Sequence, residues 1–316
     1  MTAPADATPE TWVSRAPARL QPLLRLSRFD RPIGFWLLAL PCLHGQFLGR
    51  IGEGVGLYDL FLVALFAVGA VAMRGAGCTY NDIVDRDIDA QVARTAGRPL
   101  PAGQIGLKGA WAWLGVQLLV GLLVLLALPT PAQIVALCAV PLVAAYPFMK
   151  RITWWPQAWL GLTFNWGVLV GFAAVEGRIG PEALILYAGA IAWTIGYDTI
   201  YALQDREDDA LVGVRSTARL FAERTPLWLN RFYWAAAGLS GAAMISAGAP
   251  IYAFALFAPY AAHLFAQLRR LRPGDAGSAL AQFKANQTTG VLLALALLLA
   301  AAGPMLLAAV TGALRP

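Results

Sequence analysis

The sequence has few charged residues: Asp, Glu, Lys and Arg make up only 13% of its 316 positions, whereas 59% are hydrophobic. Soluble globular proteins carry about 25% charged residues, so this composition argues against a soluble domain. Several apolar stretches of roughly 17 to 25 residues are long enough to cross a ~30 Å hydrocarbon layer as helices. The sequence therefore predicts an all-α fold, that of a polytopic protein embedded in a lipid bilayer.

Cysteine and histidine are also scarce, with three and two residues. Cys42, Cys78 and Cys138 lie in apolar stretches, are odd in number and lack metal-ligand spacing. These features argue against a zinc site and a disulfide framework, and we interpret the cysteines as small packing residues. His44 and His263 have no obvious partners in the sequence and are assigned a structural role.

Long apolar runs define nine expected spans. They lie near Ile33–Gly49, Leu57–Cys78, Leu107–Leu128, Ala132–Tyr146, Gln157–Val175, Ala183–Leu203, Leu227–Ala247, Ile251–Leu268 and Thr288–Val310. We expect residues 1–32 to form a cytoplasmic arm, because they contain acids but no apolar run and so resemble neither a signal nor a transit peptide. Residues 33–316 are expected to form one nine-helix domain, with cytoplasmic cap segments at 79–106 and 204–226.

The basic residues are distributed unevenly among the connections between the spans. The net charge is +6, but no basic patch suited to nucleic acid forms, so we expect no nucleic-acid partner. Alternate connections hold only Arg50, Arg178 and Arg315, which predicts that the N-terminus and the two cap segments are cytoplasmic and that the C-terminus lies outside. The alanine-rich composition and the absence of a transit segment favour a bacterial inner membrane.

Acidic residues gather directly after the second and sixth spans. Asn81, Asp82, Asp85 and Asp89 follow the second span, and positions 81, 85 and 89 advance by about 40° per step on a continuing helix, so they share one face. A solvated helix end is the simpler interpretation of this group alone. A second group follows the sixth span with a similar pattern, at Asp198, Asp205 and Asp209.

Two carboxylate stripes at one membrane surface would repel each other, and a divalent cation resolves that repulsion. Oxygen ligands without nearby His or Cys favour Mg²⁺. A calcium loop beginning at Asp85 fails, because Ala90 stands where glycine is needed and Ala96 where a bidentate Glu belongs.

Mg²⁺ usually bridges carboxylates to substrate phosphates, and basic residues accompany both acidic groups. Each of these basic residues alone is explained as a topology signal, whereas together they predict a site for two metal ions and a diphosphate. They are Arg94, Arg98, Lys150, Arg151, Arg206 and Arg215. A diphosphate site at the membrane implies a lipid-tailed substrate.

Three motifs resemble the signatures of the UbiA superfamily of intramembrane prenyltransferases. They are N-D-x-x-D-x-x-x-D at Asn81–Asp89, D-x-x-x-D at Asp205–Asp209 and Y-x-x-x-K at Tyr146–Lys150. The resemblance implies nine helices around a central cavity, two Mg²⁺ ions bridging the diphosphate of a polyprenyl diphosphate, and a hydrophobic tunnel for the prenyl tail.

Further segments look like the branch of that family that uses 4-hydroxybenzoate. They are Arg31–Gly34, Met73–Cys78, Arg94–Pro101, Tyr146–Arg151, Tyr197–Thr199 and Gly213–Thr217. The branch implies Mg²⁺-dependent prenyl transfer to the ring carbon ortho to the hydroxyl of 4-hydroxybenzoate, a step of ubiquinone biosynthesis.

This resemblance also suggests a role for each residue. Asn81 and Asp85 are assigned to one Mg²⁺, Asp205 and Asp209 to the other, and Asp82 and Asp89 ligate directly or through water. Arg94, Arg98, Lys150 and Arg215 are expected at the diphosphate.

For the residues proposed to act in catalysis and in acceptor binding, more than one assignment is open. Lys150 with Tyr146 is expected to assist departure of the diphosphate, and Asp198 to help with the phenol or ring proton, although helix packing explains Asp198 equally well. Arg74 stands inside a predicted span, where a buried arginine usually faces a polar interior, so it is the first candidate for the acceptor carboxylate. Arg31 is the second.

Two competing functions are open from the sequence. The first is a UbiA-type enzyme with another acceptor, namely homogentisate, a naphthoate, haem or a chlorophyllide. The second is a cation-coupled transporter, but transporters place coupling acids near the bilayer midplane, whereas these acids lie at the ends of spans.

Overall fold

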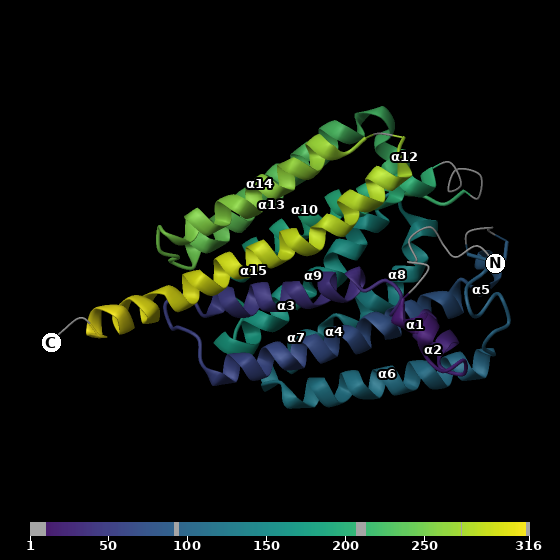
Figure 1. Cartoon of the computed structure of the whole chain (residues 1–316), viewed down its shortest axis with the longest axis horizontal. Coiled ribbons are helices and arrows are strands. Elements are labelled where there is room, and N and C mark those ends of the chain that lie inside the picture. The colour runs from purple at the N-terminus through teal and green to yellow at the C-terminus, as the bar shows by residue number, and fades with distance from the viewer. Residues whose placement is uncertain (1–10, 92–94, 207–212, 273, 314–316) are drawn as a thin grey trace. The chain divides into compact units, whose positions relative to one another are not determined.

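The computed structural model describes residues 11–91, 95–206, 213–272 and 274–313, and within these residues it contains helices and no strand (Figure 1). Side chains are described for the same residues except Ile88, Asp205 and 304–313. The all-α prediction is confirmed.

Each of the nine predicted spans is helical. The long helices are α3 (Ile33–Gly49), α4 (Leu57–Val84), α6 (Leu107–Ala127), α7 (Thr130–Cys138), α8 (Val140–Ile152), α9 (Pro156–Glu176), α10 (Pro181–Ala202), α13 (Thr225–Ser246), α14 (Ala253–Arg270) and α15 (Ala276–Ala313). Shorter elements are α1 (Trp12–Arg15), α2 (Gln21–Leu26), α5 (Arg86–Asp89), η1 (Leu203–Asp205), α12 (Thr217–Phe221) and η2 (Ala222–Arg224).

Six helical segments of the described chain are long and apolar enough to cross a membrane. They are Leu57–Val84, Leu107–Ala127, Thr130–Ile152, Pro156–Glu176, Pro181–Ala202 and Ala276–Gly303, and α3 is apolar but shorter. The chain is therefore an integral membrane protein, and the count of nine spans stays a prediction. Helix α4 has 28 residues and rises roughly 42 Å, so it is longer than a ~30 Å hydrocarbon layer.

The fourth predicted span is divided into α7 and α8 at Ala139. Pro141 lies in the first turn of α8, where a backbone N–H would have no partner within the helix, so its absence does not weaken α8. The same lack of an N–H prevents proline from continuing the backbone hydrogen bonds of α7. The span predicted at Ala132–Tyr146 lies within the apolar segment Thr130–Ile152, but it is interrupted and its bounds differ from those of α7 and α8. Pro147 lies inside α8 and removes a second backbone hydrogen bond one turn before the end of the helix.

The chain divides into two compact units, and each is described by itself. Unit 1 consists of residues up to Ala39 together with Ala64–Ala127, and unit 2 consists of Leu40–Val63 together with Leu128 onward. The predicted division into an arm and a single domain stays a prediction.

Unit 1 is held together by a small core and a buried glutamine. Leu26, Leu100 and Ala110 form the core. Gln117 of α6 donates to the Ser27 hydroxyl (2.6 Å) and accepts from the Thr79 hydroxyl of α4 (3.1 Å). Buried polar groups need such partners, so Gln117 fixes the chain after α2 against the end of α4.

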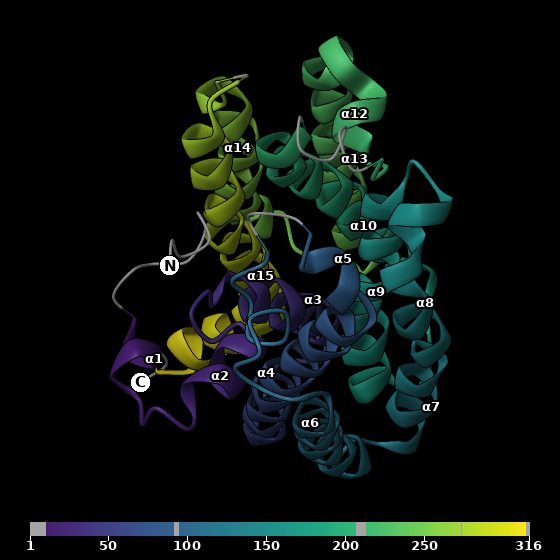
Figure 2. The same cartoon turned by 90° about the vertical axis from the view of Figure 1, so that its right-hand side faces the viewer.

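Unit 2 is built around α10, which contacts α9, α13 and α15 (Figures 1 and 2). Gly189 of α10 allows a close approach of α13, since an added Cβ would lie 3.3 Å from the Ala236 carbonyl oxygen. The side chain of Asn165 in α9 donates to the Thr194 hydroxyl of α10 at 2.7 Å. Small residues and interhelical hydrogen bonds of this kind join membrane helices.

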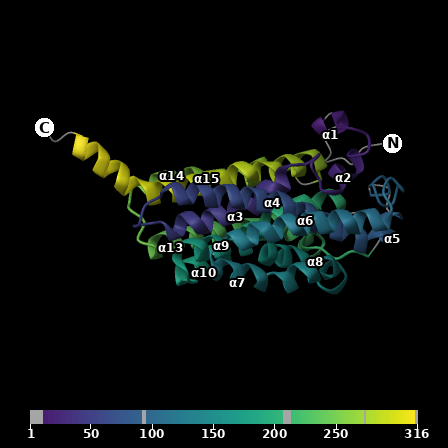
Figure 3. The ribbon, with the colours of Figure 1, turned by 90° about the horizontal axis from the view of Figure 1, so that it is seen from below.

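Helix α14 packs on α13 and α15, and it runs beside α15 in Figure 3. His263 of α14 lies 2.8 Å from the Thr289 hydroxyl, and His44 of α3 lies 2.8 Å from the Gly290 carbonyl oxygen. The structural interpretation of the histidines is consistent with these contacts, but both have partners on α15 that the sequence did not reveal.

Candidate active site

The first acidic motif keeps an α-helical register from α4 into α5. The Asp85 N–H donates to the Asn81 carbonyl (2.9 Å), and the Asp89 N–H donates to the Asp85 carbonyl (2.8 Å). Asp82 and Asp85 are fully buried and Asp89 is nearly so. Three carboxylates are thus withdrawn from water at one end of α4, and buried carboxylates require compensating charge.

Arg28 supplies part of that compensation to Asp82. Its Nη2 atom lies 2.7 and 2.9 Å from the two carboxylate oxygens, and the side chains are buried. Burial alone would lower the pKa of Arg28, but the carboxylates of Asp82 and Asp30 outweigh it and raise that pKa. No motif or spacing in the sequence singles out Arg28, so this contact was not predicted.

Arg98 joins two acids of the same motif. Its Nη1 atom lies 3.2 Å from Asp82 Oδ1 and 2.6 Å from Asp89 Oδ2. Burial raises the pKa of the Asp89 carboxyl and the neighbouring acids Asp82 and Asp85 raise it further, while Arg98 opposes them. The predicted diphosphate ligand Arg98 therefore already lies within the predicted metal site.

The two candidates for the acceptor carboxylate are also in unit 1. Arg31 donates to Asp30 Oδ2 at 3.2 Å. The guanidinium of Arg74 packs on Gly34 of α3, where an added Cβ would overlap the Arg74 Nε atom. Glycine at position 34 therefore leaves the space that the Arg74 side chain occupies.

The second acidic motif begins on α10 in unit 2. Asp198 is half-buried near the end of α10, and the helix then tightens into the 3-10 turn η1, which ends at Asp205. The α-helical spacing used to predict one face from Asp198 to Asp209 is therefore not maintained as far as Asp205. The side chain of Asp205, and Asp209 and Arg94 as a whole, lie outside the described residues.

Two tyrosines near Asp198 in the chain pack on one phenylalanine of α15. The ring centroid of Phe283 lies 4.6 Å from that of Tyr201 and 5.9 Å from that of Tyr197. Phe283 was not singled out in the sequence. Only the packing of α15 on α10 brings it to this position.

Arg215 lies at the C-terminal end of α8, next to Lys150. The Arg215 N–H donates to the Lys150 carbonyl at 3.2 Å, and its Nη1 atom donates to the Ile152 carbonyl at 2.6 Å. Cations at the end of a helix stabilise its unpaired carbonyls. Lys150 and Tyr146 are half-buried and one turn apart on α8, so three of the residues predicted for the diphosphate or its departure lie along one end of this helix.

The segment after Arg215 is fixed to two membrane helices. The Thr217 hydroxyl lies 2.6 Å from that of Thr199 in α10, and the Thr217 N–H donates to the Gln157 side chain of α9 at 3.0 Å. These buried contacts position the end of the predicted 204–226 cap segment.

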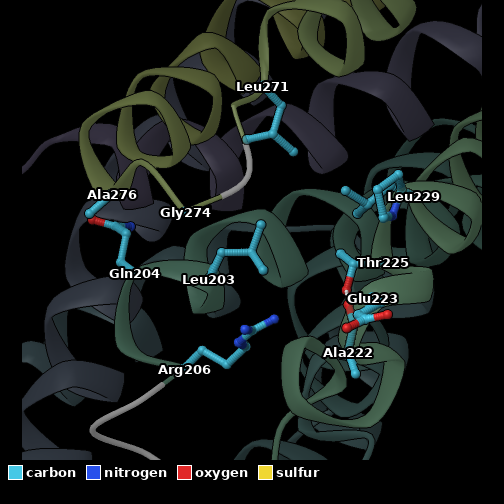
Figure 4. A pocket seen from close by; sticks show the side chains of 11 residues that line it. Leu203, Gln204, Arg206, Ala222, Glu223, Thr225, Leu229, Leu271, Gly274 and Ala276 are labelled. Carbon is cyan, nitrogen blue, oxygen red and sulfur yellow. Dashed lines mark hydrogen bonds between the residues drawn. The ribbon is translucent and has the colours of Figure 1, made fainter.

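A cavity of about 490 Å³ lies beside the second motif (Figure 4). It is lined by Leu203, Gln204, Arg206, Ala222, Glu223, Thr225, Pro226, Leu229, Leu271, Gly274 and Ala276. Ala222 has a positive φ of 47°, which is uncommon for a residue with a side chain. Arg206, predicted near the diphosphate, is exposed and lines this cavity.

Among the side chains that the structure describes, no three His, Cys, Asp or Glu residues gather as a metal-binding group. The two acidic motifs belong to different units, and two of the predicted ligands have no described side chain. The predicted metal-binding roles of Asn81, Asp82, Asp85, Asp89, Asp205 and Asp209 therefore stay predictions.

Comparison with protein families gives one decisive match. The model of the UbiA prenyltransferase family matches residues 38–290, which is most of the chain. The chain belongs to this family. The UbiA resemblance drawn from the acidic motifs is thereby confirmed.

The sequence of this UbiA protein is similar to those of its relatives over most of their length. The chain is 44% identical to the mitochondrial 4-hydroxybenzoate polyprenyltransferase of Bos taurus, over 94% of this chain and 80% of the relative. It is 43% identical to the protein of the same name from Homo sapiens, over 91% of this chain and 77% of the relative.

Solved structures of UbiA homologues have the same fold. The apo structure of a homologue from Aeropyrum pernix K1 is 26% identical and superposes with a TM-score of 0.69, covering 83% of this chain and 96% of the other. A homologue from Archaeoglobus fulgidus bound to GPP and Mg²⁺ is 19% identical and has a TM-score of 0.64, over 88% of this chain and 99% of the other. The second likeness concerns the fold alone.

Proposed function

We propose that this UbiA protein transfers a polyprenyl chain from its diphosphate to 4-hydroxybenzoate. The carbon–oxygen bond to the diphosphate breaks, a carbon–carbon bond forms at the ring position ortho to the hydroxyl, and the ring proton is lost. The observation that carries the proposal is the 44% identity, over 94% of the chain, to an enzyme named for this acceptor.

The first motif suits a hard divalent cation. Asn81, Asp85 and Asp89 offer oxygen donors on one helical register, and Asp85 is fully buried. Mg²⁺ prefers such oxygen ligands and usually binds through one or two carboxylates together with substrate phosphates. When bound, Mg²⁺ supplies positive charge that stabilises the departing diphosphate. We propose two ions, one at each acidic motif.

Asp82 has a different role in this proposal. Both of its oxygens are engaged by Arg28 and one also by Arg98, so we assign it to positioning the arginines and the motif. We assign Asn81, Asp85 and Asp89 to the ion. Arg98, which is bound to Asp82 and Asp89, is placed to contact the diphosphate next to that ion.

We also assign basic side chains outside the first motif to the diphosphate. Lys150 and Arg215 lie at the end of α8, and we assign them, together with Arg94, to the leaving group. Positive groups held in position stabilise the charge that develops as the bond breaks. Arg74, with Arg31 as the second candidate, pairs with the acceptor carboxylate, and Asp198 accepts the ring or phenol proton.

The apolar helices exclude water from the allylic cation. Water would capture the cation and give a prenyl alcohol, and water exclusion prevents such side reactions. A site inside the bilayer also admits the apolar tail of the donor directly from the membrane.

The test is a reaction of the purified protein with geranyl diphosphate, Mg²⁺ and 4-hydroxybenzoate. We expect 3-geranyl-4-hydroxybenzoate by mass spectrometry and NMR. Homogentisate and a dihydroxynaphthoate serve as alternative acceptors in parallel. If one of these acceptors gave product and 4-hydroxybenzoate gave none, the proposed acceptor would be wrong, whereas the proposed reaction, prenyl transfer to an aromatic ring, would stand.

The membrane orientation is also proposed. The bias of Lys and Arg toward alternate connections supports a cytoplasmic N-terminus and an outside C-terminus, and reporter fusions to the two termini test it. A bacterial inner membrane stays a prediction from composition, and the relatives named as mitochondrial proteins do not support it.

A further inference from the structure

Three arginines surround a cavity at the junction of α14 and α15. Arg269 and Arg270 end α14 and Arg272 follows it, and all three are exposed. The cavity has a volume of about 560 Å³ and is wide open to its surroundings. It is lined by Arg269, Arg270, Arg272, Asp275, Gly277, Ser278 and Ala281.

The charge of this cavity is positive. Its lining residues include three arginines and one aspartate, an excess of two positive charges. The carboxylate of Asp275 is engaged at the start of α15, where its Oδ1 atom accepts the Ser278 N–H at 3.0 Å. Asp275 therefore caps the helix, and the cavity keeps its excess of arginine.

The backbone between the arginines is fixed by Ser278. Its hydroxyl accepts the Arg272 N–H at 2.9 Å and donates to the Arg270 carbonyl at 3.2 Å. The positions of Arg270 and Arg272 are thus tied to the first turn of α15. A site whose backbone is ordered beforehand loses less entropy on binding.

The cavity lies at the end of a membrane helix. The candidate span Ala276–Gly303 begins among the residues that line the cavity. Helix α14 runs beside α15 (Figures 1 and 3) and ends at Arg270, which also lines the cavity. Basic pockets between membrane helices at the bilayer surface are suited to the phosphate of anionic lipids.

We propose that this cavity binds the headgroup of an anionic phospholipid, with the phosphodiester between Arg269, Arg270 and Arg272. Three features favour this ligand: the excess of positive charge, the fixed backbone and the position at the end of a candidate span. The site is separate from both acidic motifs in its residues, and the proposal does not depend on the proposed enzymatic function.

The experiment measures lipid preference in the full-length protein. The chain is reconstituted in phosphatidylcholine with a minor fraction of spin-labelled phosphatidylglycerol or phosphatidylcholine, and the protein-bound fraction of each label is determined by electron paramagnetic resonance. We expect phosphatidylglycerol to be preferred. The triple variant Arg269→Gln/Arg270→Gln/Arg272→Gln should reduce that preference at least about fivefold, since arginines near an anionic surface attract acidic lipid headgroups.

A matched control removes the same charge elsewhere. Arg19, Arg224 and Arg231 are also exposed, and replacing these three with Gln should leave the preference within about twofold of the parent if the cavity is specific. An equal loss in both triple variants, or no preference in the parent protein, would overturn the proposal.

A single substitution with the opposite sign guards against misfolding of the triple variant. Asp275→Asn keeps an oxygen for the Ser278 N–H but removes the acid, so the preference for phosphatidylglycerol should rise about twofold or more. An unchanged or lowered preference in a folded Asp275→Asn protein would contradict an anion site at this position.

Discussion

Arg28 places one nitrogen within hydrogen-bonding distance of both carboxylate oxygens of Asp82, which lies 54 positions further along the chain. Both side chains are buried, so each depends on the other for charge compensation. Breaking such a pair is costly because it leaves an uncompensated buried charge. The pair links the segment before the first predicted span to the first acidic motif.

Replacement of Arg28 by Ala should lower stability by about 3–5 kcal/mol, because Asp82 would keep only its longer contact with Arg98. The measurement is thermal unfolding in detergent. The double variant Arg28→Ala/Asp82→Ala should be less destabilised than the sum of its single variants, and Arg19→Ala, at an exposed position, is the control. Additive losses would show that the pair is not coupled.

Asp85→Asn should abolish turnover while the protein stays folded, since the amide keeps the shape of the side chain but loses the charge of a metal ligand. Turnover with 4-hydroxybenzoate and the unfolding temperature are measured together. EDTA should stop the parent enzyme and Mg²⁺ should restore it. Near-parental turnover in Asp85→Asn would remove this residue from the metal site.

Arg74→Ala should raise KM for 4-hydroxybenzoate at least about tenfold with little change for the donor, which corresponds to roughly 1.4 kcal/mol of lost binding. Gly34→Ala should act in the same direction, because its methyl group would displace the Arg74 guanidinium. Gly77→Ala is the matched control on α4, since nothing lies within 4 Å of a Cβ there. Equal losses for both substrates would transfer the role to Arg31.

Lys150→Gln should lower kcat about tenfold or more, or roughly 1.4 kcal/mol of transition-state stabilisation, if the ammonium offsets charge on the leaving diphosphate. Arg151→Gln removes the neighbouring charge and should change kcat little. A donor with a better leaving group should recover part of the rate in Lys150→Gln. Unchanged kcat with normal membrane insertion would leave Lys150 with only a topological role.

The positions of the helices were predictable from the sequence because the length of each apolar stretch determines where a membrane helix can form. The expected bounds Ile33–Gly49 coincide with α3, and the predicted helical segments after it shift by a few residues or lengthen, as α15 does. The exception is the fourth span, where Pro141 starts a new helix. Hydropathy is insensitive to that break, because proline interrupts hydrogen bonding without making the segment polar.

The candidate site was predictable only in its local parts. The spacing of Asn81, Asp85 and Asp89 predicts one helical face without any tertiary information. Pairs such as Arg28 with Asp82, or Phe283 with Tyr201, depend on how distant helices pack, and no sequence spacing encodes that. Arg28 was therefore indistinguishable from the other basic residues of the arm.

The contact between Arg28 and Asp82 also has a consequence for biogenesis. Helix α3 and most of α4 lie between the two residues in the chain. If both helices cross the membrane as predicted, the pair forms only when the two ends of this segment emerge on the same side. A hairpin inserted with one end on the wrong side would leave two opposite charges stranded, each without its partner. We therefore expect the ion pair to favour the correct topology of the first helices, and loss of either residue should increase the fraction of chains removed by membrane quality control.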